Sequence, residues 1–330
     1  MPRRRIALLA AAALAAALLA LAAGCAGGAA RGARDGAVAE KPTLKIGYLP
    51  ITHSAPLMLA DAATSGDLGD AKLELVPFSS WPELTEALNT GAIDGAVTML
   101  EIALASAEKG IDAKLVALSH RGGDALIVAE DISSAGELAG RRFAIPHRLS
   151  GHNILLRTAL AREGLTTDDL EWVEMPPPDM PAALARGDIA GYVVAEPFGA
   201  KAVAEGFGKE LLRAEELWPD WPCCGLVLRG DVLAEEPEAA QALVTAFVDA
   251  ADSIAADPVA AATTAADYTA YDAALWERSF GLGIRYDDLT PRADEVARIR
   301  DELAEMELLS GSADVDAFLE TSLVEKAYAE

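Results

Sequence analysis

The sequence has little cysteine, few aromatic side chains and few basic residues. Three cysteines stand among 330 residues, and Cys223 and Cys224 are adjacent, so a disulfide between them would close only a small strained ring. This composition excludes a small secreted domain held together by disulfides. Aspartate and glutamate outnumber lysine and arginine by 52 to 27, which gives a net charge of −25. Such a surface repels nucleic acid and anionic lipid headgroups, so neither is an expected partner.

The N-terminus has the pattern of an export signal. Arginines at positions 3–5 precede an apolar run over 6–23, which is typical of a secretory signal peptide, here residues 1–24. Residues 21–25 read Leu-Ala-Ala-Gly-Cys, which resembles a bacterial lipobox. This resemblance predicts lipidation of Cys25. The alternative is an uncleaved membrane anchor, because the run approaches the ~20 residues that cross a bilayer.

We therefore expect an exported lipoprotein. Its lipid would hold it on the periplasmic or outer face of the cell membrane. Residues 25–41, rich in glycine and alanine, would form a flexible tether between the lipid and the folded part.

After the tether, short apolar runs alternate with segments of helical period. The first strand-like runs are 44–49, 73–78, 94–97 and 113–118. The same alternation continues from 126 to 205, which predicts an α/β fold with parallel sheets and helical crossovers. The strand signal fades beyond Gly225. Helices are predicted there over 237–256, 259–266, 273–280 and 293–306.

Every histidine follows the end of a predicted strand. The four are His53, His120, His147 and His152. Ligands of open parallel α/β sheets bind at that edge, so these positions predict a binding site. No pair has the spacing of a helical metal motif, and we expect neither a metal site nor a cofactor. The sequence also lacks a G-x-S-x-G elbow, a phosphate-binding glycine loop and a paired-carboxylate signature, so we expect no catalytic residue.

Five short motifs occur in an order that carries a family resemblance. They are Gly47-Tyr48-Leu49-Pro50 with Ala55-Pro56-Leu57, Ser80-Trp81, Gly91-Ala92-Ile93-Asp94-Gly95, Met175-Pro176-Pro177-Pro178-Asp179-Met180, and Ala195-Glu196-Pro197-Phe198. The ordered set resembles the nitrate/sulfonate/taurine (and bicarbonate) solute-binding proteins of ABC importers, which are related to the binders of thiamine-pyrimidine precursors. The resemblance covers about residues 43–230 closely and the helical remainder loosely.

The resemblance implies a two-lobed, type II periplasmic-binding-protein fold with parallel-rich sheets and a helical C-terminal segment. Lobe one would comprise residues 42–126, and lobe two would comprise 127–225. Residues 226–330 would return to lobe one and add the C-terminal helices.

The resemblance also implies which residues line the cleft between the lobes. They are Leu49, Pro50, His53, Ser54, Ser80, Trp81, Met99, Asp124, His147, His152, Asn153, Glu196 and Cys224. Two of them depart from the family's anion binders, since Asp124 stands at an amide position and Cys224 at a lysine position. Both changes remove positive potential, and a desolvated anion without compensation is costly. Nitrate and bicarbonate are therefore disfavoured, although Asp124 could instead only cap a turn after Gly122-Gly123.

The function implied is capture of a small organic molecule for an ABC permease and its ATPase. A sulfonate or taurine-like compound, an amine or a heterocycle fits, and the protein would act as a monomer without catalysis. Two alternatives stay open. One is an enzyme on the same fold that acts on a pyrimidine or a small acid. The other is a ligand-sensing lipoprotein that serves a signalling partner.

Overall fold

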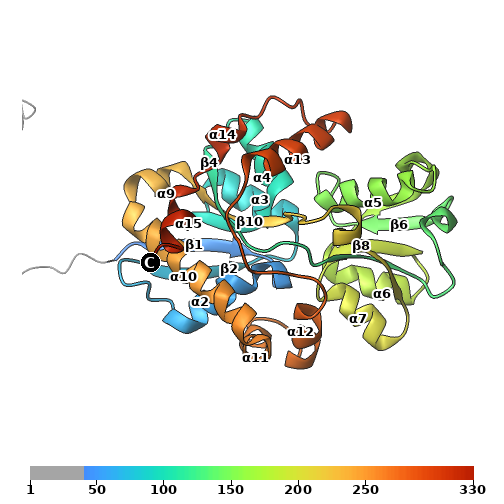
Figure 1. The fold of residues 1–330 in the computed structure, drawn as a ribbon, viewed down its shortest axis with the longest axis horizontal. Helices are drawn as coiled ribbons and strands as arrows, with labels where there is room; N and C mark the ends of the chain where they lie inside the picture. The colour runs from blue at the N-terminus through green and yellow to red at the C-terminus, as the bar shows by residue number, and fades with distance from the viewer. Residues whose placement is uncertain (1–40) are drawn as a thin grey trace, which may run out of the picture. The chain divides into compact units, whose positions relative to one another are not determined.

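The computed structural model describes residues 41–330, which form two lobes with one sheet each (Figure 1). The expected signal peptide and Cys25 lie outside the described residues. The first sheet has the order β2-β1-β3-β10-β4, and the second has the order β7-β6-β8-β5-β9. The predicted α/β class is confirmed.

Each sheet contains four parallel strands and one antiparallel strand. In the first sheet β10 runs antiparallel to its neighbours β3 and β4, and in the second sheet β5 does so between β8 and β9. The strands of the first sheet are β1 (Thr43–Tyr48), β2 (Lys72–Pro77), β3 (Gly95–Met99), β4 (Ala113–Leu118) and β10 (Cys224–Arg229). Those of the second are β5 (Asp124–Val128), β6 (Arg142–Ile145), β7 (Glu171–Glu174), β8 (Gly191–Ala195) and β9 (Lys209–Arg213).

Helices cover the faces of both sheets (Figure 1). The first half of lobe one carries α2 (Ala55–Thr64), α3 (Trp81–Thr90) and α4 (Leu100–Glu108), with a short 3-10 turn η1 (Thr52–Ser54) before them. Lobe two carries α5 (Gly151–Ala161), α6 (Met180–Ala185), α7 (Phe198–Glu205) and α8 (Ala214–Leu217), with 3-10 turns η2 (Ala135–Leu138), η3 (Thr167–Asp169) and η4 (Pro177–Asp179). Strands β3 and β8 are buried along their whole length, as expected of parallel strands covered on both sides.

The chain after β10 is helical, as predicted. It forms α9 (Gly230–Glu235), α10 (Pro237–Ala256), α11 (Pro258–Ala266), α12 (Ala273–Phe280), α13 (Ala293–Glu305), α14 (Val315–Phe318) and α15 (Ser322–Ala327). Prolines open α10 and α11, where the missing N–H costs no helical hydrogen bond. Helix α10 is long and apolar enough to cross a membrane by length and composition, but half of its most apolar window is buried inside the protein, where it packs on α2 and α15.

The lobes divide a few residues before the boundaries expected from the sequence. Residues 119–123 connect the two sheets in one direction, and residues 214–223 connect them in the other. The boundary expected at 126/127 falls inside β5, which belongs entirely to the second sheet. The boundary expected at 225/226 falls inside β10, so Cys224 and Gly225 belong to lobe one.

Candidate functional site

The two crossovers between the lobes lie side by side. Ser119 N–H donates to the carbonyl of Cys224 over 2.9 Å, and Gly122 N–H donates to the carbonyl of Trp221 over 2.9 Å. Side chains from both crossovers are therefore brought together at the junction of the lobes. This junction lies at the carboxyl ends of the parallel strands β1 and β4, which is the edge where ligands bind in such sheets.

A cluster of six side chains fills this junction, and we call it the hinge cluster. Its members are His53 from η1, His120 from the first crossover, Asp124 from the start of β5, His152 from the first turn of α5, Cys223 from the second crossover and Cys224 from the start of β10. All six are between 0% and 1% exposed, which is unusual for ionisable groups unless each is paired.

The sulfur atoms and the His53 ring form the tightest part of the hinge cluster. His53 Nδ1 lies 3.4 Å from Cys224 Sγ and 3.6 Å from Cys223 Sγ. The two sulfurs lie 3.7 Å apart, so the thiols are not joined in a disulfide. The rings of His53 and His120 are 3.7 Å apart between centroids. Ligand atoms of His53, His120, Cys223 and Cys224 all lie within 4.8 Å of one another, close enough to share one metal ion.

Asp124 holds one imidazole of the hinge cluster by a hydrogen bond and lies close to a second. Its Oδ1 atom lies 2.8 Å from His152 Nε2 and 3.5 Å from His53 Nε2. Its Oδ2 atom accepts a 3.0 Å hydrogen bond from the indole N–H of Trp221. Nε2 of His53 faces Asp124 without a hydrogen bond of normal geometry, and the other ring nitrogen, Nδ1, faces the two sulfurs. Asp124 thus contacts the ring and does more than cap a turn.

Burial sets the ionisation of the hinge cluster. It lowers the pKa of His53 to about 4, so this ring is neutral at neutral pH, and it also holds the pKa of His120 well below the usual range. Burial raises the pKa of both thiols, Cys223 and Cys224. For Asp124 burial acts to raise the pKa, but the neighbouring imidazoles of His152 and His53 outweigh it and hold the pKa below the usual range.

Several buried polar atoms at and around the hinge cluster make no hydrogen bond of normal geometry with the protein. Both ring nitrogens of His120 and Nδ1 of His152 are among them. So are both carboxyl oxygens of Glu101, which burial keeps neutral by raising its pKa to about 8. An unpaired buried polar atom costs about 1–3 kcal/mol, so a cluster of them is expected where a ligand supplies the missing partners.

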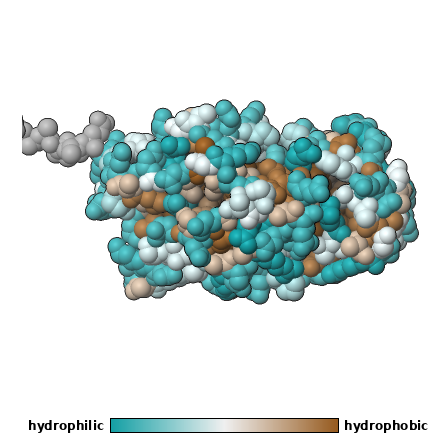
Figure 2. Space-filling view, turned by 90° about the horizontal axis from the view of Figure 1, so that it is seen from above, coloured by the Kyte–Doolittle hydropathy of each residue, from teal (hydrophilic) through white to brown (hydrophobic). Residues whose placement is uncertain are grey.

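A pocket of about 520 Å³ lies beside this junction and is lined by both lobes. Its lining is Leu49, Pro50, Ile51, Pro77, Phe78, Ser79, Glu83, Pro177, Pro178, Phe198, Thr269, Ala270 and Tyr271. The loop that supplies its first three residues continues directly into His53, so pocket and hinge cluster share one segment. The face in Figure 2 is mainly hydrophilic, with hydrophobic residues gathered toward its middle.

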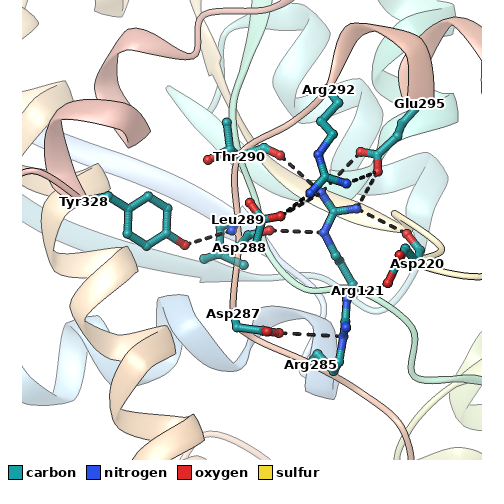
Figure 3. A network of polar contacts seen from close by, with 10 residues as sticks. All are labelled: Arg121, Asp220, Arg285, Asp287, Asp288, Leu289, Thr290, Arg292, Glu295 and Tyr328. Atoms are coloured by element: carbon teal, nitrogen blue, oxygen red, sulfur yellow. Dashed lines mark hydrogen bonds and ion pairs between the residues drawn. The ribbon is translucent and has the colours of Figure 1, made fainter.

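A buried arginine fixes the crossovers to the C-terminal part of the chain (Figure 3). Arg121, in the first crossover, binds both carboxyl oxygens of Glu295 at 2.8 and 3.3 Å. Its guanidinium also donates to the carbonyls of Asp220, Asp288 and Thr290, each at 3.2 Å. Asp220 belongs to the second crossover, so one side chain ties both connections to the segment before α13.

The structure brings together some of the residues expected to line the cleft. His53, Asp124, His152 and Cys224 meet in the hinge cluster. Met99 is buried and pairs with Cys224 across β3 and β10. Leu49 and Pro50 line the pocket.

The other expected residues are not among the six side chains of the hinge cluster. The carbonyl of Glu196 accepts hydrogen bonds from the N–H and hydroxyl of Thr52, which joins the two lobes. Ser54, Ser80 and Trp81 stand at the starts of α2 and α3, where Ser54 and Trp81 are buried.

Two expected residues belong to a loop of lobe two. His147 Nδ1 accepts a 3.0 Å hydrogen bond from the N–H of Leu149. The amide of Asn153 donates to the carbonyl of Arg148. Both shape the loop between β6 and α5, and neither belongs to the hinge cluster, so their roles as ligand contacts stay predictions.

Three side chains of the site are absent from the residues expected to line the cleft. They are His120, which the strand-end pattern alone placed at the binding edge, Cys223, whose adjacency to Cys224 argues only against a disulfide, and Trp221, which carries no sequence signal. The useful signal is the occurrence of Cys223-Cys224 together with histidines at strand ends, because the fold places the crossovers that carry His120 and Cys223 side by side.

Two lobes with one sheet each, joined by two crossovers, form the periplasmic-binding-protein fold, and the predicted fold is confirmed. The chain belongs to the NMT1-like family, whose sequence profile matches residues 37–269. The resemblance to nitrate, sulfonate and taurine binding proteins is likewise confirmed by the relatives described next.

A ligand-binding component of an ABC-type import system from Staphylococcus aureus, solved with zinc bound, is 36% identical; the match covers 87% of this chain and 99% of that one, with a TM-score of 0.81. The nitrate/nitrite binding protein NrtA of Nostoc is 26% identical over 66% of this chain. This chain spans only 55% of that relative's length. The taurine-binding periplasmic protein of Escherichia coli is 29% identical over 64% of this chain and 66% of its own length.

Proposed function

We propose that the protein is the exported solute-binding lipoprotein of an ABC importer, which captures a small solute where its lobes meet and delivers it to a membrane permease with an ATPase. The observation that carries this proposal is the hinge cluster, whose buried polar atoms come from both lobes and both crossovers and need a partner. A site built from both lobes couples ligand binding to lobe closure. The relatives that are named as binding components of import systems support the same reading.

The pocket beside the hinge cluster supports an organic solute. Phe78, Phe198 and Tyr271 give it an aromatic lining, which suits a heterocycle or the apolar part of an amine or sulfonate. Nitrate and bicarbonate fit poorly, because the carboxylate of Asp124 would repel an anion at the junction. The chain would act as a monomer, and no step of catalysis is needed.

A thermal-shift panel tests capture without turnover. The full-length protein is heated with taurine, alkanesulfonates, nitrate, bicarbonate, amines, aminopyrimidines and divalent cations. We expect at least one solute to raise the melting temperature, since binding to the folded state alone stabilises it, by about 2.7 kcal/mol at a hundredfold excess over Kd. Nitrate and bicarbonate should have no effect. Chemical conversion of the stabilising solute, followed by mass spectrometry, would replace this proposal with the enzyme alternative.

Anchoring is tested separately by Cys25→Ala. Loss of the acylated cysteine should move the protein from the membrane fraction to the soluble fraction of cells, because the lipid supplies the membrane affinity. Fractionation with immunoblotting measures this, and Cys223→Ala is the matched control, since that cysteine is buried in the folded part. A Cys25→Ala protein that stays in membranes would favour the uncleaved anchor.

A further inference from the structure

The hinge cluster has the donor atoms and spacing of a metal site. In a tetrahedral site with metal–sulfur bonds of about 2.3 Å and metal–nitrogen bonds of about 2.0 Å, two sulfurs lie roughly 3.8 Å apart and a nitrogen lies roughly 3.5 Å from a sulfur. The sulfurs of Cys223 and Cys224 are 3.7 Å apart, and His53 Nδ1 lies 3.4 and 3.6 Å from them. These three atoms therefore already form one face of such a tetrahedron.

His120 offers the fourth donor. Its ligand nitrogen lies within 4.8 Å of the other three donor atoms. Neither of its ring nitrogens makes a hydrogen bond of normal geometry, although the ring is fully buried. A hydrogen bond between a thiol and an imidazole would explain one contact of His53, but not two sulfurs at similar distances from one nitrogen, nor an unpaired second imidazole.

The surroundings of His53 match those of histidines that bind metals. Such a histidine usually donates a hydrogen bond from its second ring nitrogen to an acceptor such as a carboxylate, which fixes the orientation of the ring. Here Asp124 Oδ1 lies 3.5 Å from His53 Nε2, while Nδ1 faces the sulfurs. Asp124 is itself held by His152 and Trp221, so the orienting carboxylate comes from lobe two and the four donors come from lobe one and the crossovers.

We propose that His53, His120, Cys223 and Cys224 bind a tetrahedral transition-metal ion, with Zn²⁺ as the best fit, and that this ion, in place of the organic solute suggested by the pocket lining, is the solute that the protein captures. Two thiols and two imidazoles are the donor set of closed zinc sites. Coordination displaces one proton from each thiol, and the two protons leave for solvent. The assignment of the ion as cargo rests on the proposed import function, whereas the metal site does not. The proposed metal site replaces the sequence-based expectation of no metal. That expectation rested on the spacing of histidines along the chain, whereas the proposed donors come together only in the folded structure.

Metal titration of the full-length protein tests the site. The protein is freed of metal by chelation, kept reduced, and titrated with Co²⁺ and then Zn²⁺. We expect one Co²⁺ per chain with a near-ultraviolet sulfur-to-cobalt charge-transfer band, and displacement of that band by Zn²⁺. A chain that binds Co²⁺ without this band, or binds neither ion, overturns the proposal, and this readout needs no variant.

Variants identify the donors. Cys224→Ala and His120→Ala should each weaken Zn²⁺ binding by more than the roughly 10–100-fold that loss of an orienting residue costs. Asp124→Asn should weaken it by roughly 10–100-fold and keep the charge-transfer band, because the thiolates stay. Asp231→Asn is the control for the loss of a carboxylate, since Asp231 lies on α9 with its side chain 52% exposed and belongs to no part of the site. Equal losses in the control and the donor variants would contradict the assignment.

Uptake measurements separate the two proposals. If Zn²⁺ binds as described and deletion of the gene reduces zinc uptake by cells, both stand. If Zn²⁺ binds but uptake is unchanged, the site stands and the cargo assignment falls. If Zn²⁺ does not bind while an organic solute stabilises the protein, the metal site falls and the import function stands.

Discussion

Arg121→Met should lower the free energy of unfolding by about 3–5 kcal/mol, the usual cost of breaking a buried ion pair by removing one partner. The side chain of Arg121 is 2% exposed, and its loss removes the guanidinium donor of three backbone carbonyls and one of the two arginines that bind the Glu295 carboxylate (Figure 3). Arg292 still contacts Glu295, so the lower half of that range is expected. Urea unfolding measures the change as a lower midpoint with an unchanged slope.

Arg285→Met is the matched control for this change. Arg285 also pairs with Asp220, but its side chain is 49% exposed and that of Asp220 is 60% exposed. Pairs of this kind contribute about 0–1 kcal/mol, so the control should unfold near the wild-type midpoint. Similar losses in both variants would show that Arg121 acts as an ordinary surface charge and does not fix the crossovers.

The second large effect is on the pH dependence of stability. Burial raises the pKa of Glu101 from 4.5 to about 8. The folded state therefore holds a proton that the unfolded state releases above pH 4.5, and stability falls as pH rises from about 4.5 to about 8 and then levels off. Glu101→Gln cannot release this proton. It should match the wild type near pH 5 and exceed it near pH 8 by an amount on the order of 3–4 kcal/mol.

Melting curves of metal-free protein between pH 5 and pH 8 measure this difference. Burial also raises the pKa of Glu196 to about 7, so the wild type and the variant share that part of the pH dependence and only their difference reports Glu101. Glu86→Gln, on an exposed face of α3, controls for the loss of one negative charge. If the melting temperatures of the wild type and Glu101→Gln changed in parallel with pH, the raised pKa of Glu101 would be contradicted.

The helical part of the fold was predictable because its signals are local. Helices 237–256 and 273–280 were predicted with the bounds that the structure has, since proline and aspartate mark their starts and apolar residues recur at helical spacing. Strand β9 (Lys209–Arg213) was missed, because Lys-Glu-Leu-Leu-Arg shows no alternation and forms a strand only by pairing with β5.

The site was predictable only in part, because its chemistry depends on the crossovers. Histidines at strand ends predicted a binding edge, and His53, His120 and His152 do meet there. His147 follows a strand equally well, yet its ring turns to its own loop. The adjacent cysteines Cys223 and Cys224 carry no local signal for a partner histidine. His53, which they contact, lies 170 and 171 residues away in the sequence, and only the fold of the crossovers brings them together.

Strand β10 also constrains the order in which the protein can be assembled. It lies between β3 and β4, yet it is made only after the whole of lobe two. Lobe two is continuous, so its sheet can form from its own segment as soon as that segment has been released for folding. The sheet of lobe one must wait with an open slot between β3 and β4, and closing it over so long a stretch of chain is slow. Chaperones should therefore bind the unfinished N-terminal half of the chain, even though it is made first; if the proposed export holds, these would be chaperones outside the cytoplasm.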